Sequence, residues 1–258
     1  MRLLSLFART ELQFALEYRA NLVLDLFEEL IVVVTSVLAV LVIFGHTGVI
    51  NGWTLGQMIV LLGVYYVIQG AQSVLFEVSF ERFMEHVRLG TLDFILLKPV
   101  NSQFMISARY VQMAQVGQVL LGLVLVSVGV GQIGKAVGPF ELISFGLTLM
   151  CGLSLVYSLL LVLGTLAFWF VRVENLMAIF WSFIDAGRFP VDVYPGWLRV
   201  TLSTVVPIGV AVTVPAQAVA GRLDGVGLAL MLGGTFVVGW FASWFWRLGV
   251  RNYTGASA

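Results

Sequence analysis

Long stretches of this sequence carry no charged side chain, and this feature constrains the fold more than any other. The uncharged runs include Leu30–Phe44, Met58–Ile68, Val119–Val130 and Leu155–Val171. Charged residues make up 11% of the 258 positions, whereas a soluble domain has roughly 25%. A helix of about 20 mainly apolar residues crosses the ~30 Å hydrocarbon layer. Membrane barrels alternate apolar and polar residues, and these runs do not. The sequence therefore predicts an all-α, polytopic membrane protein forming a single transmembrane domain over residues 1–258.

Six spanning helices are expected from the apolar runs. We place them at residues 22–44, 54–76, 104–130, 141–170, 174–187 and 226–246. The segment before them, residues 2–20, has apolar side chains recurring on one helical face, with Arg2 and Arg9 on the opposite face. This pattern predicts an amphipathic helix that lies in the membrane interface.

The fifth expected span is unusually short. Only 13 residues separate Asn175 from Gly187, inclusive, which is about 20 Å of helix. The apolar sequence that follows contains Pro190, Pro195, Pro207 and Pro215, and each proline removes a backbone donor. Irregular backbone at membrane depth must be covered by protein or line a wet cavity. We therefore expect a re-entrant outer segment over residues 188–222.

The distribution of Lys and Arg predicts the orientation of the chain. With six spans and cytoplasmic N- and C-termini, ten basic residues fall inside and four fall outside, as the positive-inside rule requires. The inner set is Arg2, Arg9, Arg19, Arg82, Arg88, Lys98, Arg109, Arg172, Arg247 and Arg251, and the outer set is Lys135, Arg188, Arg199 and Arg222.

The largest expected cytoplasmic loop covers residues 77–103. Its first half, Glu77–Leu89, is amphipathic, with Phe80 and Phe83 on the apolar face. Gly90 is a natural stop for this helix. Two interpretations are open for the loop. It is either a solvated connector on the membrane surface or an element to which a cytoplasmic protein docks.

One stretch of this loop resembles a known family. The sequence Arg88-Leu-Gly-Thr-Leu-Asp-Phe-Ile-Leu-Leu-Lys-Pro99 is similar to the loop after the second span in permeases of ATP-binding-cassette (ABC) transporters, type-2 exporter family. That family pattern is E-x-G-T-L-E-x-L-L-x-T/S-P. Asp93 replaces its second Glu, and Lys98 stands where Thr or Ser is common. The stretch Gly187–Pro195, with Trp197 and Leu198, resembles a branch often encoded as paired permeases.

The resemblance implies a permease subunit of an ABC exporter in the bacterial plasma (inner) membrane. Two permeases would form the substrate path, either as a heterodimer, which the paired branch favours, or as a homodimer. Each would dock an ABC ATPase subunit, with two copies per complex, and ATP and Mg would bind to the ATPase and not to this chain. Membrane lipids would surround it. The residues implied for ATPase docking are Glu81, Arg82, Glu85, Arg88, Gly90, Thr91, Leu92, Asp93, Lys98 and Pro99.

No catalytic or metal-ligating constellation stands out in the sequence. Gly129–Lys135 nearly matches a phosphate-binding loop, but Ala136 stands where Ser or Thr must hold magnesium. His46 and His86 are isolated from other metal ligands. The formal net charge is zero, which gives no reason to expect a nucleic-acid partner. We therefore expect a chain that is not an enzyme, and an intramembrane enzyme is the least favoured class of function.

Asp185 and Arg188 are the sharpest candidates inside the membrane. Asp185 lies about 15 Å along the helix from Asn175, and an intramembrane charge costs at least ~2.5–3.5 kcal/mol unless it is paired or faces a cavity. We expect an intramembrane ion pair, with a role in the substrate path as the alternative. Asp185 is also the one candidate relay for a rival function, an ion-coupled secondary transporter.

Acidic residues also occur where the first span begins. Asp25 and Glu29 share a helical face. They mark either an ordinary helix start at the interface or a polar lining of an inner vestibule.

Overall fold

The computed structural model describes residues 19–97, 100–170 and 174–253, and every named element within these ranges is a helix. The chain is therefore an all-α membrane protein, as the apolar runs predicted. The expected interfacial helix at residues 2–20 lies almost wholly outside the described residues, as do Lys98 and Pro99. The long helices are α2 (Arg19–His46), α3 (Leu55–Gln72), α7 (Val116–Ile133), α8 (Pro139–Thr165) and α12 (Gly225–Asn252).

Five helical segments are long and apolar enough to cross a membrane. One of them is much longer than a bilayer requires. Helix α3 continues through a π-helical turn, η1 (Ser73–Glu77), into α4 (Val78–Arg88), so that 34 residues from Leu55 to Arg88 form one run. At 1.5 Å per residue this run is about 51 Å long, against a hydrocarbon layer of about 30 Å. The amphipathic helix expected at Glu77–Leu89 is thus a rigid extension of the second span.

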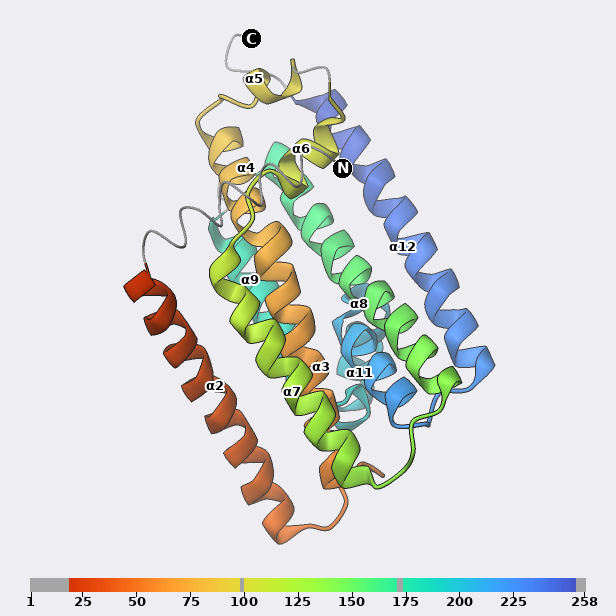
Figure 1. Ribbon diagram of the computed structural model, residues 1–258. Coiled ribbons are helices and arrows are strands. Elements are labelled where there is room, and N and C mark those ends of the chain that lie inside the picture. The colour runs from red at the N-terminus through yellow and green to blue at the C-terminus, as the bar shows by residue number, and fades with distance from the viewer. Residues whose placement is uncertain (1–18, 98–99, 171–173, 254–258) are drawn as a thin grey trace.

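The long helices form a bundle with two distinct ends, in which α2, α3, α7 and α8 alternate in direction and α12 runs the same way as α8 (Figure 1). Helix α2 begins, and α12 ends, at the end where α4, α5 (Asp93–Leu96) and α6 (Ser102–Ala108) lie. The connections from α2 to α3 and from α7 to α8 lie at the opposite end. The charged loop and the C-terminal end of the last span therefore share one side of the bundle.

Helices α3 and α7 pack closely because glycines line their contact. A Cβ atom at Gly63 would lie 2.6 Å from the backbone nitrogen of Val126, and one at Gly122 would lie 2.7 Å from that of Val67. Gly129 approaches Val60 in the same way, seven residues further along. Small residues at this spacing let helix backbones approach in a membrane, where close packing drives association.

The third span begins later than the sequence predicted. Instead of one helix from residue 104, the structure has α6, a non-helical stretch, a 3₁₀ turn η2 (Met113–Gln115) and then α7. Hydrogen bonds to η1 and α4 hold the chain at this break. The backbone of Tyr110 exchanges hydrogen bonds with the Ser79 hydroxyl, and the Gln112 amide donates to the Val74 carbonyl at 3.0 Å. Val74 lies in the π-helical turn, where the backbone pairing of the helix is altered.

The fifth expected span, at 174–187, is also corrected. It forms α9 (Glu174–Asp185), whose 12 residues measure about 18 Å and do not cross a bilayer alone. The chain then turns through two short 3₁₀ helices, η4 (Ala186–Arg188) and η5 (Val191–Val193), into α10 (Gly196–Val200) and η6 (Thr201–Val205). The next helix, α11 (Ile208–Val219), is bent by 89° from that run. This bent pair counts as a sixth crossing only if it is taken as one broken span.

The bend coincides with Pro207, which precedes α11 and cannot donate a backbone hydrogen bond. Helix α11 packs against α8, where a Cβ at Gly152 would lie 2.4 Å from the Ala211 carbonyl oxygen. The remaining short element, η3 (Leu166–Phe168), closes α8. The bent segment is therefore fixed to the bundle by close backbone contact.

Polar contacts tie the bent segment to the end of the bundle opposite α5. The Asn51 amide donates to the Asp192 carbonyl at 2.9 Å, and Arg199 donates to the same carbonyl. The Arg222 guanidinium lies 4.8 Å from the centre of the Trp53 ring and donates to the Gly52 carbonyl. The structure thus places Arg199 and Arg222 near the connection from α2 to α3.

Candidate functional site

The turn that follows α4 has a well-defined geometry. Gly90 has a φ of +66°, a conformation that favours glycine. The Thr91 amide donates to the His86 carbonyl at 3.0 Å, and the Gly90 amide donates to the Val87 carbonyl at 3.2 Å. These two bonds form a Schellman motif, which satisfies carbonyls at a helix end. The Thr91 hydroxyl lies 2.8 Å from His86 Nδ1. Gly90 and Thr91 therefore end the helix and set the direction of the chain beyond it.

The residues after the turn divide sharply into buried and exposed side chains. Leu92 is fully buried and Ile95 is nearly so, which anchors the one-turn helix α5. On the other side, Leu89, Phe94 and Leu97 are 59%, 73% and 81% exposed. Large apolar side chains exposed together are typical of interaction sites. We call Leu89, Phe94 and Leu97 the apolar tip.

Charged residues of the predicted docking set line the same element. Glu81, Arg82 and Glu85 are exposed, with Arg82 and Glu85 3.5 Å apart. Arg88 is exposed at the last position of α4, and Asp93 is partly exposed at the first position of α5. These residues lie on α4, which leads to the apolar tip, and at the start of α5. The sequence analysis did not single out the apolar tip. The sequence did hold a signal for the apolar tip, because Phe94 and Leu97 are large apolar residues in a short stretch that ends at Lys98.

A cluster of aromatic rings packs against the buried side of α4. Phe83 is buried, with its ring centre 5.3 Å from that of Trp246 on α12 and 5.7 Å from that of Phe168. Phe168 in turn contacts the Tyr253 ring at 5.6 Å. Burial, and then the nearby Asp93 carboxylate, raise the pKa of Tyr253, so its hydroxyl stays protonated. The contacts connect α4 to α12 and to the end of α8.

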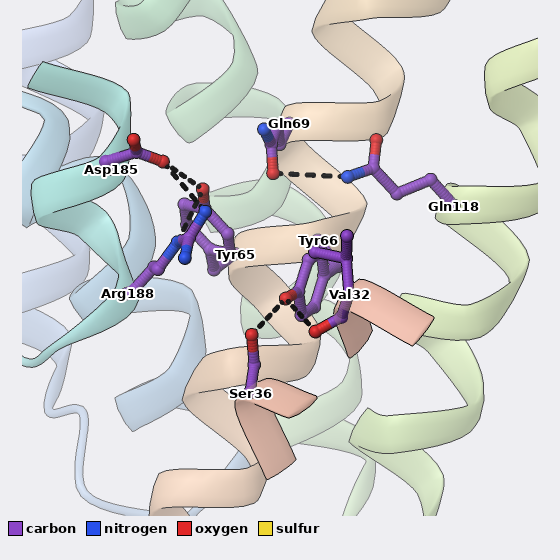
Figure 2. Close-up of polar contacts among 8 residues, drawn as sticks. All are labelled: Val32, Ser36, Tyr65, Tyr66, Gln69, Gln118, Asp185 and Arg188. Atoms are coloured by element: carbon purple, nitrogen blue, oxygen red, sulfur yellow. Dashed lines mark hydrogen bonds and ion pairs between the residues drawn. The ribbon is translucent and has the colours of Figure 1, made fainter. Parts of the chain in front are cut away.

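A second group of polar side chains lies where α9 and the turn after it meet α3 (Figure 2). Arg188 Nη2 lies 3.0 Å from Asp185 Oδ1, and the Tyr65 hydroxyl donates to the same oxygen at 3.0 Å. Arg188 Nε donates to the Tyr65 hydroxyl at 3.2 Å. The guanidinium also lies 5.5 Å from the centre of the Tyr65 ring. Tyr65 comes from α3, so the three residues join the second span to the short α9.

The ion pair expected between Asp185 and Arg188 is present, at the surface of the single subunit. The side chains of Arg188 and Asp185 are 38% and 57% exposed in the single subunit. The pair therefore faces outward from the bundle and is not enclosed by it. Tyr65 was missed because it is 120 residues from Asp185 in the sequence, and no local pattern connects them.

Two further polar contacts are made by residues that follow Tyr65 on α3 (Figure 2). The Tyr66 hydroxyl donates to Ser36 Oγ of α2 at 2.7 Å. One turn on, the Gln118 amide of α7 donates to Gln69 Oε1 at 3.1 Å. Helix α3 therefore carries a series of polar contacts to α2, α7 and α9.

The acidic residues at the start of α2 line a small cavity of about 210 Å³. Its walls are formed by Asp25, Glu28, Glu29, Val32, Gln115 and Gln118. Both readings made from the sequence agree with this position, at the end of α2 that lies toward α4. Within the described ranges, no three His, Cys, Asp or Glu side chains converge in a way that could hold a metal ion.

Comparison with known proteins places these features in context. A family model described as ABC-2 family transporter protein matches residues 30–257, which is nearly the whole chain. No curated protein and no solved structure matches.

Proposed function

We propose a function for this chain from the premise that it belongs to the ABC-2 family of transporter proteins. It is the permease subunit of an ABC exporter, embedded as a multi-pass protein in the bacterial inner membrane with both termini in the cytoplasm. ATP hydrolysis takes place in a separate ABC ATPase, which binds ATP and Mg. Membership of the family implies that an ABC ATPase associates with the permease.

The observation that carries this proposal is the apolar tip. Leu89, Phe94 and Leu97 are exposed at the end of a helical run too long to be contained in the bilayer. Their surroundings are charged, with Glu85 and Arg88 on the adjoining face of α4. An apolar centre with a charged rim is the usual composition of a protein interface. We assign this surface to the ATPase.

Coupling to ATP hydrolysis requires a rigid connection between the ATPase-docking surface and the spanning helices. The run from Leu55 to Arg88 is one helical body, and it packs on α7 through glycine contacts. Displacement of α4 by an ATPase would therefore be transmitted to Tyr65 and its partners. The substrate path would lie where this polar group meets a second permease, either a related chain or a second copy.

The polar group also argues against the ion-coupled alternative. Asp185 accepts hydrogen bonds from both Arg188 and Tyr65. A carboxylate held by two fixed partners suits a structural ion pair, whereas a residue that carries a coupling ion must exchange its partner during transport. The geometry therefore suits a fixed ion pair.

The test is the replacement of Phe94 by Ser in the full complex. The complex is purified from native membranes, its partner is identified by mass spectrometry, and ATPase stimulation is measured after reconstitution. If the tip is the dock, Phe94→Ser weakens retention of the ATPase by about tenfold, because an aromatic anchor contributes at least ~1–2 kcal/mol at an interface.

Phe140→Ser is the matched control. Phe140 is 53% exposed at the start of α8, at the opposite end of the bundle. This variant should keep the ATPase and its stimulation. Retention of the ATPase at the wild-type level by Phe94→Ser would overturn the assignment of the dock.

A further inference from the structure

Two adjoining cavities open between α6, α8 and α12, at the end of the bundle that carries α4 and α5. The headgroup cavity has a volume of about 430 Å³ and is lined by Asn101, Ser102, Gln103, Ser243, Trp246 and Arg247. The chain cavity has a volume of about 530 Å³ and is lined by Phe76, Asn101, Gln103, Phe104, Ser107 and Tyr157. Asn101 and Gln103 line both cavities, so the two lie side by side.

The headgroup cavity combines one cation with neutral polar groups and has no carboxylate in its lining. Arg247 Nε donates to the Ser243 carbonyl at 3.2 Å, which fixes the guanidinium beside the cavity. In the part of the chain that the structure describes, Arg247 takes part in no ion pair. Its terminal nitrogens are therefore available to an anion, and guanidinium groups bind phosphate oxygens strongly.

Gln103 orients the rest of the lining. Its amide nitrogen donates to the Tyr157 hydroxyl at 3.1 Å and to Ser243 Oγ at 3.3 Å. The Ser243 hydroxyl accepts in this contact, which leaves its own proton to donate. The side-chain oxygen of Gln103, Oε1, is left to accept. The cavity thus offers two donors for a phosphate and one acceptor for a hydroxyl group.

The depth of the site matches the headgroup layer of a bilayer. Helix α12 has 28 residues, which is about 42 Å of helix, close to the ~40–45 Å of a whole bilayer. Arg247 lies five residues before its last residue, Asn252, or about 7.5 Å along the axis. The chain cavity, with Phe76 and Phe104 in its walls, offers the apolar contact that a phosphate alone would not use.

From these contacts we infer that the paired cavities bind one anionic phospholipid, with its phosphate at Arg247 and Ser243 and an acyl chain against Phe76 and Phe104. With the orientation proposed above, this lipid belongs to the cytoplasmic leaflet, where basic pockets between spanning helices bind anionic headgroups. The site does not involve the apolar tip, so its failure would leave the proposed dock unaffected.

The inference is tested by native mass spectrometry of the purified full complex. Phosphatidylglycerol, phosphatidylcholine and inorganic phosphate are added separately, and the occupancy of each is measured. We expect phosphatidylglycerol to bind most tightly. Arg247→Gln should weaken it by about tenfold, since a hydrogen bond to a charged group is worth roughly that factor.

Arg251→Gln is the matched control, because it removes the same charge one turn later on α12 without lining either cavity. It should retain phosphatidylglycerol at the wild-type level. Ser243→Ala, which keeps all charges, provides a second variant if Arg247→Gln fails to assemble, and it too should weaken binding. Equal losses in Arg247→Gln and Arg251→Gln, no loss in Arg247→Gln or Ser243→Ala, or equally tight binding of inorganic phosphate would each overturn the assignment.

Discussion

At the scale of single residues, Tyr65 determines how the Asp185–Arg188 pair behaves. The hydroxyl of Tyr65 donates to the carboxylate and accepts from the guanidinium, so each member of the pair has two partners. The pair is also half-exposed in the single subunit. Removing the charge of Asp185 should therefore lower the free energy of unfolding less than it would at a fully buried site.

Asp185→Asn tests this reading. It leaves Arg188 without its carboxylate, and we expect a loss of about 1 kcal/mol, at the upper end for exposed pairs. The measurement is thermal unfolding of the purified subunit, with assembly followed by size-exclusion chromatography. Tyr65→Phe keeps the ion pair and removes only the hydroxyl, so it should lose less stability than Asp185→Asn. A loss of several kcal/mol in Asp185→Asn would mean that a partner subunit encloses the pair.

Gly122 is the residue on which close packing of α3 and α7 depends. A Cβ there would lie 2.7 Å from the Val67 nitrogen and 2.8 Å from the Gly63 oxygen, and backbone atoms cannot yield as a flexible side chain can. Gly122→Val should destabilise the subunit by about 1–3 kcal/mol, as overpacking does. Gly131→Val on the same helix meets no atom within 4 Å and should be tolerated. Equal thermal stabilities of the two variants would contradict the close contact.

At the scale of elements, the turn between α4 and α5 depends on one backbone conformation. Gly90 has a positive φ, so Gly90→Ala should strain the turn by about 1 kcal/mol and shift the apolar tip. We expect weaker stimulation of the ATPase with normal insertion. Gly90→Asn should recover most of the coupling, because Asn tolerates this conformation. The measurement is ATPase activity of reconstituted complexes, and wild-type stimulation by Gly90→Ala would show that the turn does not set the coupling.

At the scale of the whole molecule, exposed arginines lie at both ends of the bundle. Arg199 and Arg222 are exposed near the connection from α2 to α3, while Arg82 is exposed on α4 and Arg251 in the last turn of α12. We propose that the bent run from α10 to α11 is a re-entrant segment on the outer side. Cysteines at positions 199 and 222, in a Cys151→Ser background, should react with a membrane-impermeant maleimide added to intact cells.

Cysteines at positions 82 and 251 are the controls for this experiment. They should react only after the membrane is permeabilised. Labelling of positions 199 and 222 only from the cytoplasmic side would overturn both the outer segment and the orientation of the chain.

The sequence alone was sufficient to predict the all-α membrane fold, the positions of α2, α3, α8 and α12, and the amphipathic helix before Gly90. These features depend on local composition and periodicity, because a bilayer requires continuous apolar runs and a helix end requires a permissive residue. The Asp185–Arg188 contact was also within reach, since residues three apart share a helical face.

Only the tertiary structure decided the rest. The break before α7 depends on Ser79 and Val74, some thirty or more residues upstream of the backbone that they bind. The short α9 looked like a span because apolar composition does not reveal where a helix turns back. The Tyr65 contacts and the paired cavities both arise where distant segments meet. Such contacts follow from the packing of whole helices, and no local pattern encodes them.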